Sequence, residues 1–251
     1  MQRFEATTPV LFLSDLHLSP HRPGASGIFQ RFLRGRARSA RQIFILGDLF
    51  DAWPGDDCLQ DPRDDFVNGL VGDLADLVSS GIEVLVMHGN RDFLLGDGFV
   101  ARTGARLVPD PYVLSLPTWQ FVLSHGDAAC TDDREYQAFR SRVRRTEWRS
   151  AFLAKSLDER KQIATQLRAQ SERAKQDKAG YLMDVNPSAI DDFLRAHGYA
   201  SMIHGHTHRP ATHHHIVDGI EVERWVLSDW CEERGECLSW NGRQLTREIL
   251  T

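Results

Sequence analysis

The chain has 251 residues, a formal net charge of −5 and 41% hydrophobic residues. This length fits one large domain, and the ordinary composition excludes disordered and fibrous classes of protein. The negative net charge argues against nucleic-acid binding by the whole molecule, so no nucleic-acid partner is expected, and no obligate protein partner is inferred.

Short apolar runs recur along the chain, and each one stops at glycine or at polar residues. Continuous apolar runs of this length are typical of strands that are buried on both faces of a sheet. The runs lie at residues 10–13, 42–46, 84–87, 121–123 and 201–203. We therefore predict five buried strands.

Helical patterns separate the first three runs. Apolar residues at helical spacing predict one helix within residues 27–39 and another within 64–79. The alternation of strand and helix predicts an α/β fold. Towards the C-terminus the pattern changes to short strands separated by turns, at 224–227, 236–240 and 247–250. Together these patterns predict two sheets packed together, with helices outside.

Residues 132–182 interrupt this rhythm. They have the composition of helices rich in Arg, Lys, Gln and Ala, and residues 134–178 hold 13 Lys and Arg against 6 Asp and Glu, a net charge of +7. The rest of the chain therefore carries −12. We predict one domain over residues 1–251, with a basic helical insertion at 132–182.

The cysteines and the apolar runs predict a cytoplasmic protein. None of the four cysteines forms a C-x-x-C pair, so we expect reduced thiols and no disulfide framework. The first ten residues lack the apolar core of a signal peptide, and no apolar run approaches the ~18 residues that span a bilayer. Any membrane contact is expected to be peripheral.

The first and fifth apolar runs are each followed by a pair of residues that bind metals. Asp15 and His17 are two positions apart, so they point the same way if they continue an extended strand. His206 and His208 repeat this arrangement. We expect both pairs at one metal site.

Three further residues of ligand type each follow a separate run: Asp48, Asn90 and His125. Strand ends of a sheet fold converge on one rim, where sites usually form. A lone aspartate after a strand is more often a helix cap or a turn residue, so only the ordered set is specific. Mixed nitrogen and oxygen ligands of this number suit two divalent ions, with Mn²⁺, Fe²⁺ or Zn²⁺ favoured over Ca²⁺ or Mg²⁺.

The motifs D-x-H, G-D, G-N-R-D, H-G-D and G-H-x-H, in this order over residues 15–208, resemble the calcineurin-like metallophosphoesterase superfamily. The resemblance implies a two-sheet sandwich flanked by helices, with two metals at the strand ends and a metal-activated water as the nucleophile. It assigns one ion to Asp15, His17, Asp48 and His208, and the other to Asp48, Asn90, His125 and His206. Asp48 would then bridge the two ions. His204 is outside the motif, and we interpret it as a polar residue at a strand end.

Arg91 replaces the histidine that many members of this superfamily have after the asparagine. An arginine cannot donate a proton at neutral pH, but it can hold a phosphate by a bidentate contact. An alkoxide leaving group would need a proton donor, whereas a phosphate with a second pKa of about 6 would not. We infer that the scissile bond is a pyrophosphate.

A narrower resemblance covers most of the chain and includes Leu46–Trp53, His88–Gly96, Tyr136–Arg140 and His204–Pro210. These segments are similar to the branch of the superfamily that hydrolyses UDP-2,3-diacylglucosamine in lipid A synthesis. The resemblance implies release of UMP and 2,3-diacylglucosamine 1-phosphate, usually with Mn²⁺, by a cytoplasmic enzyme on the inner membrane surface. Asp48, Asn90, Arg91 and His206 would be catalytic, and the substrate contacts would be Asn90, Arg91, Asp133, Ser171, Lys175, Lys178 and His206. Lys175 departs from the pattern, because relatives often have a small polar residue there.

The insertion has two interpretations. Its amphipathic helices would act as a lid over acyl chains, with positive charge facing anionic headgroups, or they would form a solvated hairpin packed on the body. Two other functions also remain open. One is a phosphoesterase of this fold that acts on a soluble nucleotide, which the basic insertion and Arg91 argue against. The other is an inactive binding scaffold, which would have lost ligands, and none of the seven is missing.

Overall fold

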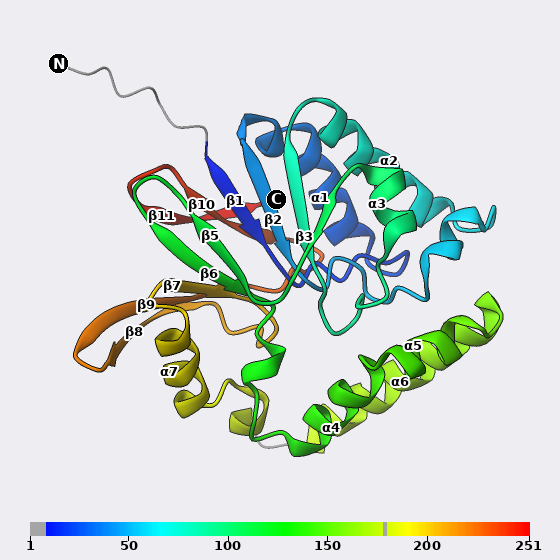
Figure 1. Ribbon diagram of the computed structural model, residues 1–251. Coiled ribbons are helices and arrows are strands. Elements are labelled where there is room, and N and C mark those ends of the chain that lie inside the picture. The colour runs from blue at the N-terminus through cyan, green and yellow to red at the C-terminus, as the bar shows by residue number, and fades with distance from the viewer. Residues whose placement is uncertain (1–8, 178–179) are drawn as a thin grey trace.

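Two β-sheets lie face to face at the centre of the computed structural model, which describes residues 9–177 and 180–251 (Figure 1). The first sheet has the strand order β11-β10-β1-β2-β3-β4, and the second has the order β5-β6-β7-β9-β8. The first comprises β1 (Val10–Leu13), β2 (Gln42–Leu46), β3 (Glu83–Met87), β4 (Arg106–Val108), β10 (Gly235–Trp240) and β11 (Leu245–Leu250). The second comprises β5 (Tyr112–Ser115), β6 (Gln120–Ser124), β7 (Ser201–His204), β8 (Ala211–Val217) and β9 (Ile220–Val226).

The side chains of β1 alternate between the two faces of the first sheet. Leu11 and Leu13 join a core beneath α1 (Pro23–Arg34), α2 (Asp65–Ser79) and α3 (Asp97–Thr103). Val10 and Phe12 point the other way, into a second core between the sheets. The strand is therefore buried on both faces, which explains why its sequence is uniformly apolar.

The outer face of the second sheet is covered by α7 (Pro187–Ala196). Val122 and Met202 of the sheet pack with Ile190 and Leu194 of this helix in a third core. The order of layers is thus helix, sheet, sheet, helix. The prediction of a two-sheet sandwich flanked by helices is confirmed.

The strands predicted from apolar runs are confirmed within one residue at either end, except that β9 begins at Ile220 and β11 at Leu245. The predicted helix at 27–39 is α1 followed by a 3₁₀ turn (Arg36–Ser39). The sequence patterns did not predict β4, β5, β8, α3 or α7. Of these, β4 and β5 are only three and four residues long, and β8 is an edge strand with several exposed polar side chains, so none carries a continuous apolar run.

Residues 132–182 contain α4 (Arg134–Val143), α5 (Thr146–Leu153), α6 (Leu157–Asp177) and part of a short 3₁₀ helix (Gly180–Met183). Figure 1 shows α5 and α6 side by side, as an arm that extends past the loops following the strands of the first sheet. Arg160 joins α6 to the body, because its guanidinium donates 2.7 and 2.9 Å hydrogen bonds to the carbonyl of Pro54 and to Asp57. Within the described ranges, no helix is both long and apolar enough to cross a membrane.

Candidate metal centre

The seven predicted ligands all lie in loops that follow β1, β2, β3, β6 and β7. Five of them have a positive φ angle, between 49° and 68°, which is uncommon for residues other than glycine: Asp15, His17, Asp48, His206 and His208. We expected the D-x-H pair and the H-x-H pair to continue extended strands, and this expectation is wrong. Left-handed residues turn the chain sharply, and this strain is typical of backbone held in place at a functional site.

Asp48 lies between the two predicted halves of the centre and is 1% exposed. Its Oδ2 is 3.7 Å from Nδ1 of His17, and its Oδ1 is 3.8 Å from Nε2 of His125. The two oxygens of one carboxylate thus face imidazoles from different strands. This is the arrangement that a ligand shared by two ions requires.

Asp15, His17 and His208 form one half of the centre. Oδ1 of Asp15 is 3.9 Å from Nε2 of His17 and 3.4 Å from Nε2 of His208, and the two imidazole nitrogens are 3.3 Å apart. The potential ligand atoms of these three residues all lie within 4.8 Å of one another. Asp15 also falls within the same distance of Asp48 and His125, so it is near both halves.

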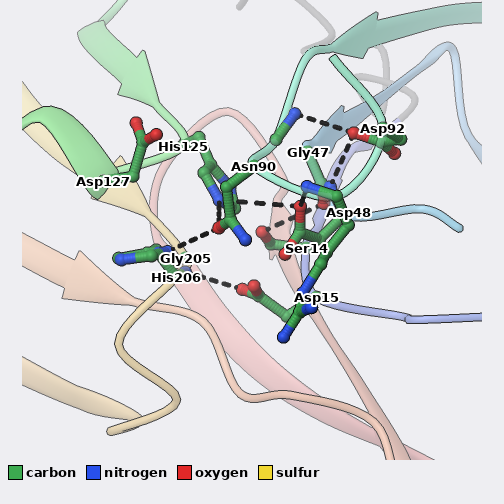
Figure 2. A network of polar contacts seen from close by, with 12 residues as sticks. Ser14, Asp15, Gly47, Asp48, Asn90, Asp92, His125, Asp127, Gly205 and His206 are labelled. Atoms are coloured by element: carbon green, nitrogen blue, oxygen red, sulfur yellow. Dashed lines mark hydrogen bonds and ion pairs between the residues drawn. The ribbon is translucent and has the colours of Figure 1, made fainter. Parts of the chain in front are cut away.

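Asn90, His125 and His206 form the other half (Figure 2). Oδ1 of Asn90 is 2.9 Å from Nε2 of His125 and 2.8 Å from Nδ1 of His206. Nδ1 of His125 lies 2.9 Å from the carbonyl oxygen of Leu46, to which only an N–H can donate. Nε2 of His125 is then the nitrogen left to bind a metal, and its orientation is fixed from behind.

Asp92, the last residue of the G-N-R-D motif, holds two of these loops together from beneath. It is fully buried, and its carboxylate accepts hydrogen bonds from four backbone N–H groups on the loops after β2 and β3: Asp48, Leu49, Phe50 and Gly89. The sequence reading gave this residue no role. The signal was present, because a carboxylate inside a G-N-x-D turn is a strong acceptor for backbone donors.

Asp127 connects the centre to the insertion. Its buried Oδ2 accepts hydrogen bonds of 2.8 Å from Tyr136 and Arg140 of α4, and Arg144 lies 3.4 Å away. Arg144 also donates to the carbonyl of Gly89, next to Asn90, at 3.1 Å. The ring of Tyr136 lies 5.6 Å from that of His206. The insertion therefore contacts the loops of both Asn90 and His125, which sequence reasoning did not foresee.

The electrostatic field of the site favours positive charge. Burial raises the pKa of Asp48 to about 7; the nearby carboxylates of Asp92 and Asp15 act in the same direction, and His125 opposes them. Burial lowers the pKa of His125, but the carboxylates of Asp48 and Asp15 outweigh this effect and raise it to about 9. Burial also lowers the pKa of His206 to about 3, so this imidazole is neutral, as a metal ligand must be.

The donor set fits divalent cations. Oδ1 of Asp15 and Nδ1 of His17 are buried and have no hydrogen-bond partner among the described residues. Buried polar atoms are almost always satisfied, so an orphaned carboxylate oxygen beside an orphaned imidazole nitrogen indicates a missing partner. A metal ion accepts both atoms as ligands.

The other predicted substrate residues are placed as follows. The backbone N–H of Arg91 donates to Oδ1 of Asp48 at 2.8 Å, and its charge acts on both His17 and Asp48. Asp133 caps α4 by accepting a hydrogen bond from the N–H of Tyr136. Ser171 is half-buried on α6. Lys178 and the side chain of Lys175 lie outside the described residues.

The histidines outside the predicted ligand set have other surroundings. His204 is buried between the carbonyl of Gly205 and Arg224. The run 213–215 lies within β8, where His213 and His214 are exposed.

Comparison with known proteins gives consistent matches. A family model for the calcineurin-like phosphoesterase matches residues 8–210. The chain is 49% identical to a UDP-2,3-diacylglucosamine hydrolase of Aromatoleum aromaticum, over 92% of this chain and 93% of that protein. It is 45% identical to one of Ralstonia nicotianae over 97% and 93% of the two chains. It is 44% identical to one of Aeromonas hydrophila over 93% and 95%.

Proposed function

The chain belongs to the calcineurin-like phosphoesterase family, and we propose that it hydrolyses the pyrophosphate bond of UDP-2,3-diacylglucosamine. The products are UMP and 2,3-diacylglucosamine 1-phosphate, in the pathway of lipid A synthesis. The observation that carries this proposal is the position of Asp48, whose two oxygens face His17 and His125 across a buried centre. Relatives that are 41–49% identical over most of their length carry this activity in their names.

In this proposal the ligand sets are those that the motifs assign. One ion is held by Asp15, His17, Asp48 and His208, and the other by Asp48, Asn90, His125 and His206. When bound, two divalent ions supply an activated water and neutralise charge on the phosphoryl oxygens. The protein supports two of these ligands from behind: Leu46 holds His125, and Asp92 holds the loop of Asp48. We propose Mn²⁺ as the metal, since nitrogen and oxygen donors are mixed here.

Arg91 accounts for the preference for an anhydride. Its backbone is fixed by Asp48, and its guanidinium adds positive charge at the centre. A guanidinium orients a phosphoryl group but donates no proton to a leaving group. A phosphate leaves without that proton, whereas an alkoxide does not. Asn90 and His206, which meet at 2.8 Å, complete the contacts proposed for the scissile phosphoryl group.

The insertion acts as a lid in this proposal, and it supplies Asp133, Ser171, Lys175 and Lys178 as further substrate contacts. Three aromatic rings form a row where the insertion packs on the body, from Phe93 to Trp148 at 6.1 Å and from Trp148 to Phe152 at 4.8 Å, and only Phe152 is buried. Leu153, which follows, is 41% exposed. This apolar strip suits acyl chains, and the surrounding basic residues suit anionic headgroups on the cytoplasmic face of the inner membrane.

The experiment compares substrates under one set of conditions. Detergent-dispersed UDP-2,3-diacylglucosamine, diadenosine tetraphosphate and a cyclic nucleotide are each incubated with the protein and Mn²⁺. We expect UMP release from the lipid at a kcat/KM at least 100 times that for either soluble nucleotide. A preference for a soluble nucleotide would retain the metal centre but overturn the lipid assignment.

A further inference from the structure

The loop that joins two of the predicted metal ligands forms part of the wall of a cavity. It holds a volume of about 240 Å³ and is lined by Asp184, Thr207, Arg209, Pro210, Ala211, His213, Arg224 and Val226. Thr207 stands between His206 and His208 in the chain, so the cavity and the metal centre share this loop.

Arg224 is the unusual member of this lining. It is 6% exposed and lies on β9, directly opposite His213 of the edge strand β8. Its hydrogen bonds go to two imidazole nitrogens, those of His204 at 3.0 Å and His215 at 3.1 Å. Within residues 9–177 and 180–251 no carboxylate forms an ion pair with it, and burial lowers its pKa. The carboxylate of Asp184 acts on Arg224 only from a distance, because its ion pair is with Arg209, so an anion in the cavity would give this guanidinium a direct partner.

The remaining polar atoms of the cavity agree with this requirement. The hydroxyl of Thr207 is buried and has no hydrogen-bond partner among the described residues. The one acidic residue, Asp184, already pairs with Arg209 at 2.7 Å. Partial burial and the charge of Arg224 lower the pKa of His213, which disfavours a further positive charge in the cavity. Two guanidinium groups against one carboxylate leave a net positive charge and a free hydroxyl.

We propose that this cavity binds a phosphoryl oxyanion between Arg224 and Thr207. The choice of a phosphoryl group over other anions rests on the proposed function, which releases phosphate monoesters next to this loop. His215 and His204 engage Nε and Nη1 of Arg224, so a tetrahedral oxyanion would accept from Nη2 and from the hydroxyl of Thr207 at the same time. The cavity is a different site from the metal centre, because none of the seven predicted ligands lines it.

Occupancy of the cavity also affects the metal loop. Arg224 donates to Nε2 of His204, and Nδ1 of His204 lies 2.9 Å from the carbonyl of Gly205. The same carbonyl accepts the N–H of Thr207 at 2.8 Å. An anion on Arg224 and Thr207 therefore stabilises both ends of the turn that presents His206. We expect tighter packing of this turn when phosphate is bound.

The test uses the full chain with Asp48→Asn, dialysed against a chelator, so that the metal centre itself does not bind phosphate. Inorganic phosphate is titrated into this protein by calorimetry, and we expect one saturable site per chain. Arg224→Gln in the same background is expected to lower the affinity at least tenfold, and Thr207→Val at least threefold. Arg195→Gln is the matched control, because Arg195 is a surface arginine paired with Asp218. The phosphate affinity of this variant should equal that of the parent protein.

Thr207→Val keeps the test valid if Arg224→Gln does not fold, since valine has nearly the same shape as threonine. A second titration with UMP distinguishes the source of the phosphoryl group. Tighter binding of UMP than of phosphate indicates the nucleotide product, and equal binding indicates free phosphate. Absence of a saturable site, or equal affinity in both cavity variants and the parent, would overturn the proposal. This result is independent of catalysis, so hydrolysis by the wild type would still stand.

Discussion

The carboxylate of Asp92 holds the backbone of Asp48 in place, with Oδ1 accepting the N–H of Asp48 at 3.3 Å. The same carboxylate accepts from Gly89 at 2.8 Å and from Leu49 at 2.7 Å, so it fixes two loops at once. Asp48 has a positive φ of 54° and depends on such support to keep its conformation. Asp92 therefore has a positioning role in the centre without facing it.

Asp92→Ala should lower the free energy of unfolding by about 3 kcal/mol, because several buried N–H donors would lose their acceptor. Asp92→Asn keeps one acceptor oxygen and should cost less. Urea denaturation of the metal-free protein measures both values. Asp76→Ala, at an exposed position on α2, is the control and should change the value by less than about 0.5 kcal/mol. An Asp92→Ala protein as stable as the control would show that these hydrogen bonds contribute little.

Arg140→Gln tests the link between the insertion and the metal loops. The variant leaves buried Asp127 without its closest charged partner, at 2.8 Å in the wild type. We expect a loss of about 2 kcal/mol in unfolding free energy, below the full cost of breaking a buried pair, because Arg144 stays near. We also expect kcat to fall by a larger factor than the number of metal ions bound per chain. Arg145→Gln, an exposed neighbour, should match the wild type in both measurements.

The pair of Arg36 and Glu248 gives a pH-dependent prediction. The guanidinium donates two hydrogen bonds to the carboxylate, at 2.6 and 2.7 Å, and these lower the pKa of Glu248. A pKa that is lowered in the folded state stabilises the protein at pH values above the unfolded-state pKa of about 4.3. This contribution is lost as the pH falls through the folded-state pKa. Glu248→Gln should therefore cost about 1 kcal/mol at pH 7 and much less near pH 3.

Denaturation of both proteins at the two pH values measures this difference. Glu233→Gln, at an exposed position, is the control and should cost little at either pH. A cost for Glu248→Gln that is the same at pH 7 and pH 3 would contradict the electrostatic origin.

Exposed cations of the insertion should govern membrane binding. Arg134, Arg142 and Lys155 are all exposed, and replacing all three with Gln removes three positive charges. At about 1 kcal/mol per charge near an anionic surface, co-sedimentation with anionic vesicles should fall at least tenfold. Binding by the wild type should weaken with added salt. Equal binding of wild type and variant would place the membrane contact elsewhere.

Much of the fold was predictable because its strands are buried on both faces. Runs such as Ile43–Leu46 have no polar alternation, and this pattern together with the intervening helices indicated the layered architecture. Strands on the edges of the sheets gave no such signal. In β8, residues 211–217 alternate only weakly, since several polar side chains are exposed there.

The grouping of the candidate ligands in space was predictable, but their backbone geometry was not. The motif order brought Asp48, Asn90 and His125 together as expected, because parallel strands end on one rim. Asp and His are enriched among residues with a positive φ, but only a few per cent of residues other than glycine adopt one, so residue type alone did not predict the left-handed backbone at Asp15 and His17. The role of Asp127 depends on Arg140 of the insertion, and the sequence alone did not place these two residues side by side.

The most direct test of the two-metal account is UMP release from UDP-2,3-diacylglucosamine with Mn²⁺, for wild type and Asp48→Asn. Metal content of both purified proteins is measured in parallel. We expect two ions per chain in the wild type, with loss of metal and a fall of at least 1,000-fold in kcat/KM in the variant, because one carboxylate serves both ions. Hydrolysis by Asp48→Asn at a rate near that of the wild type would contradict the account.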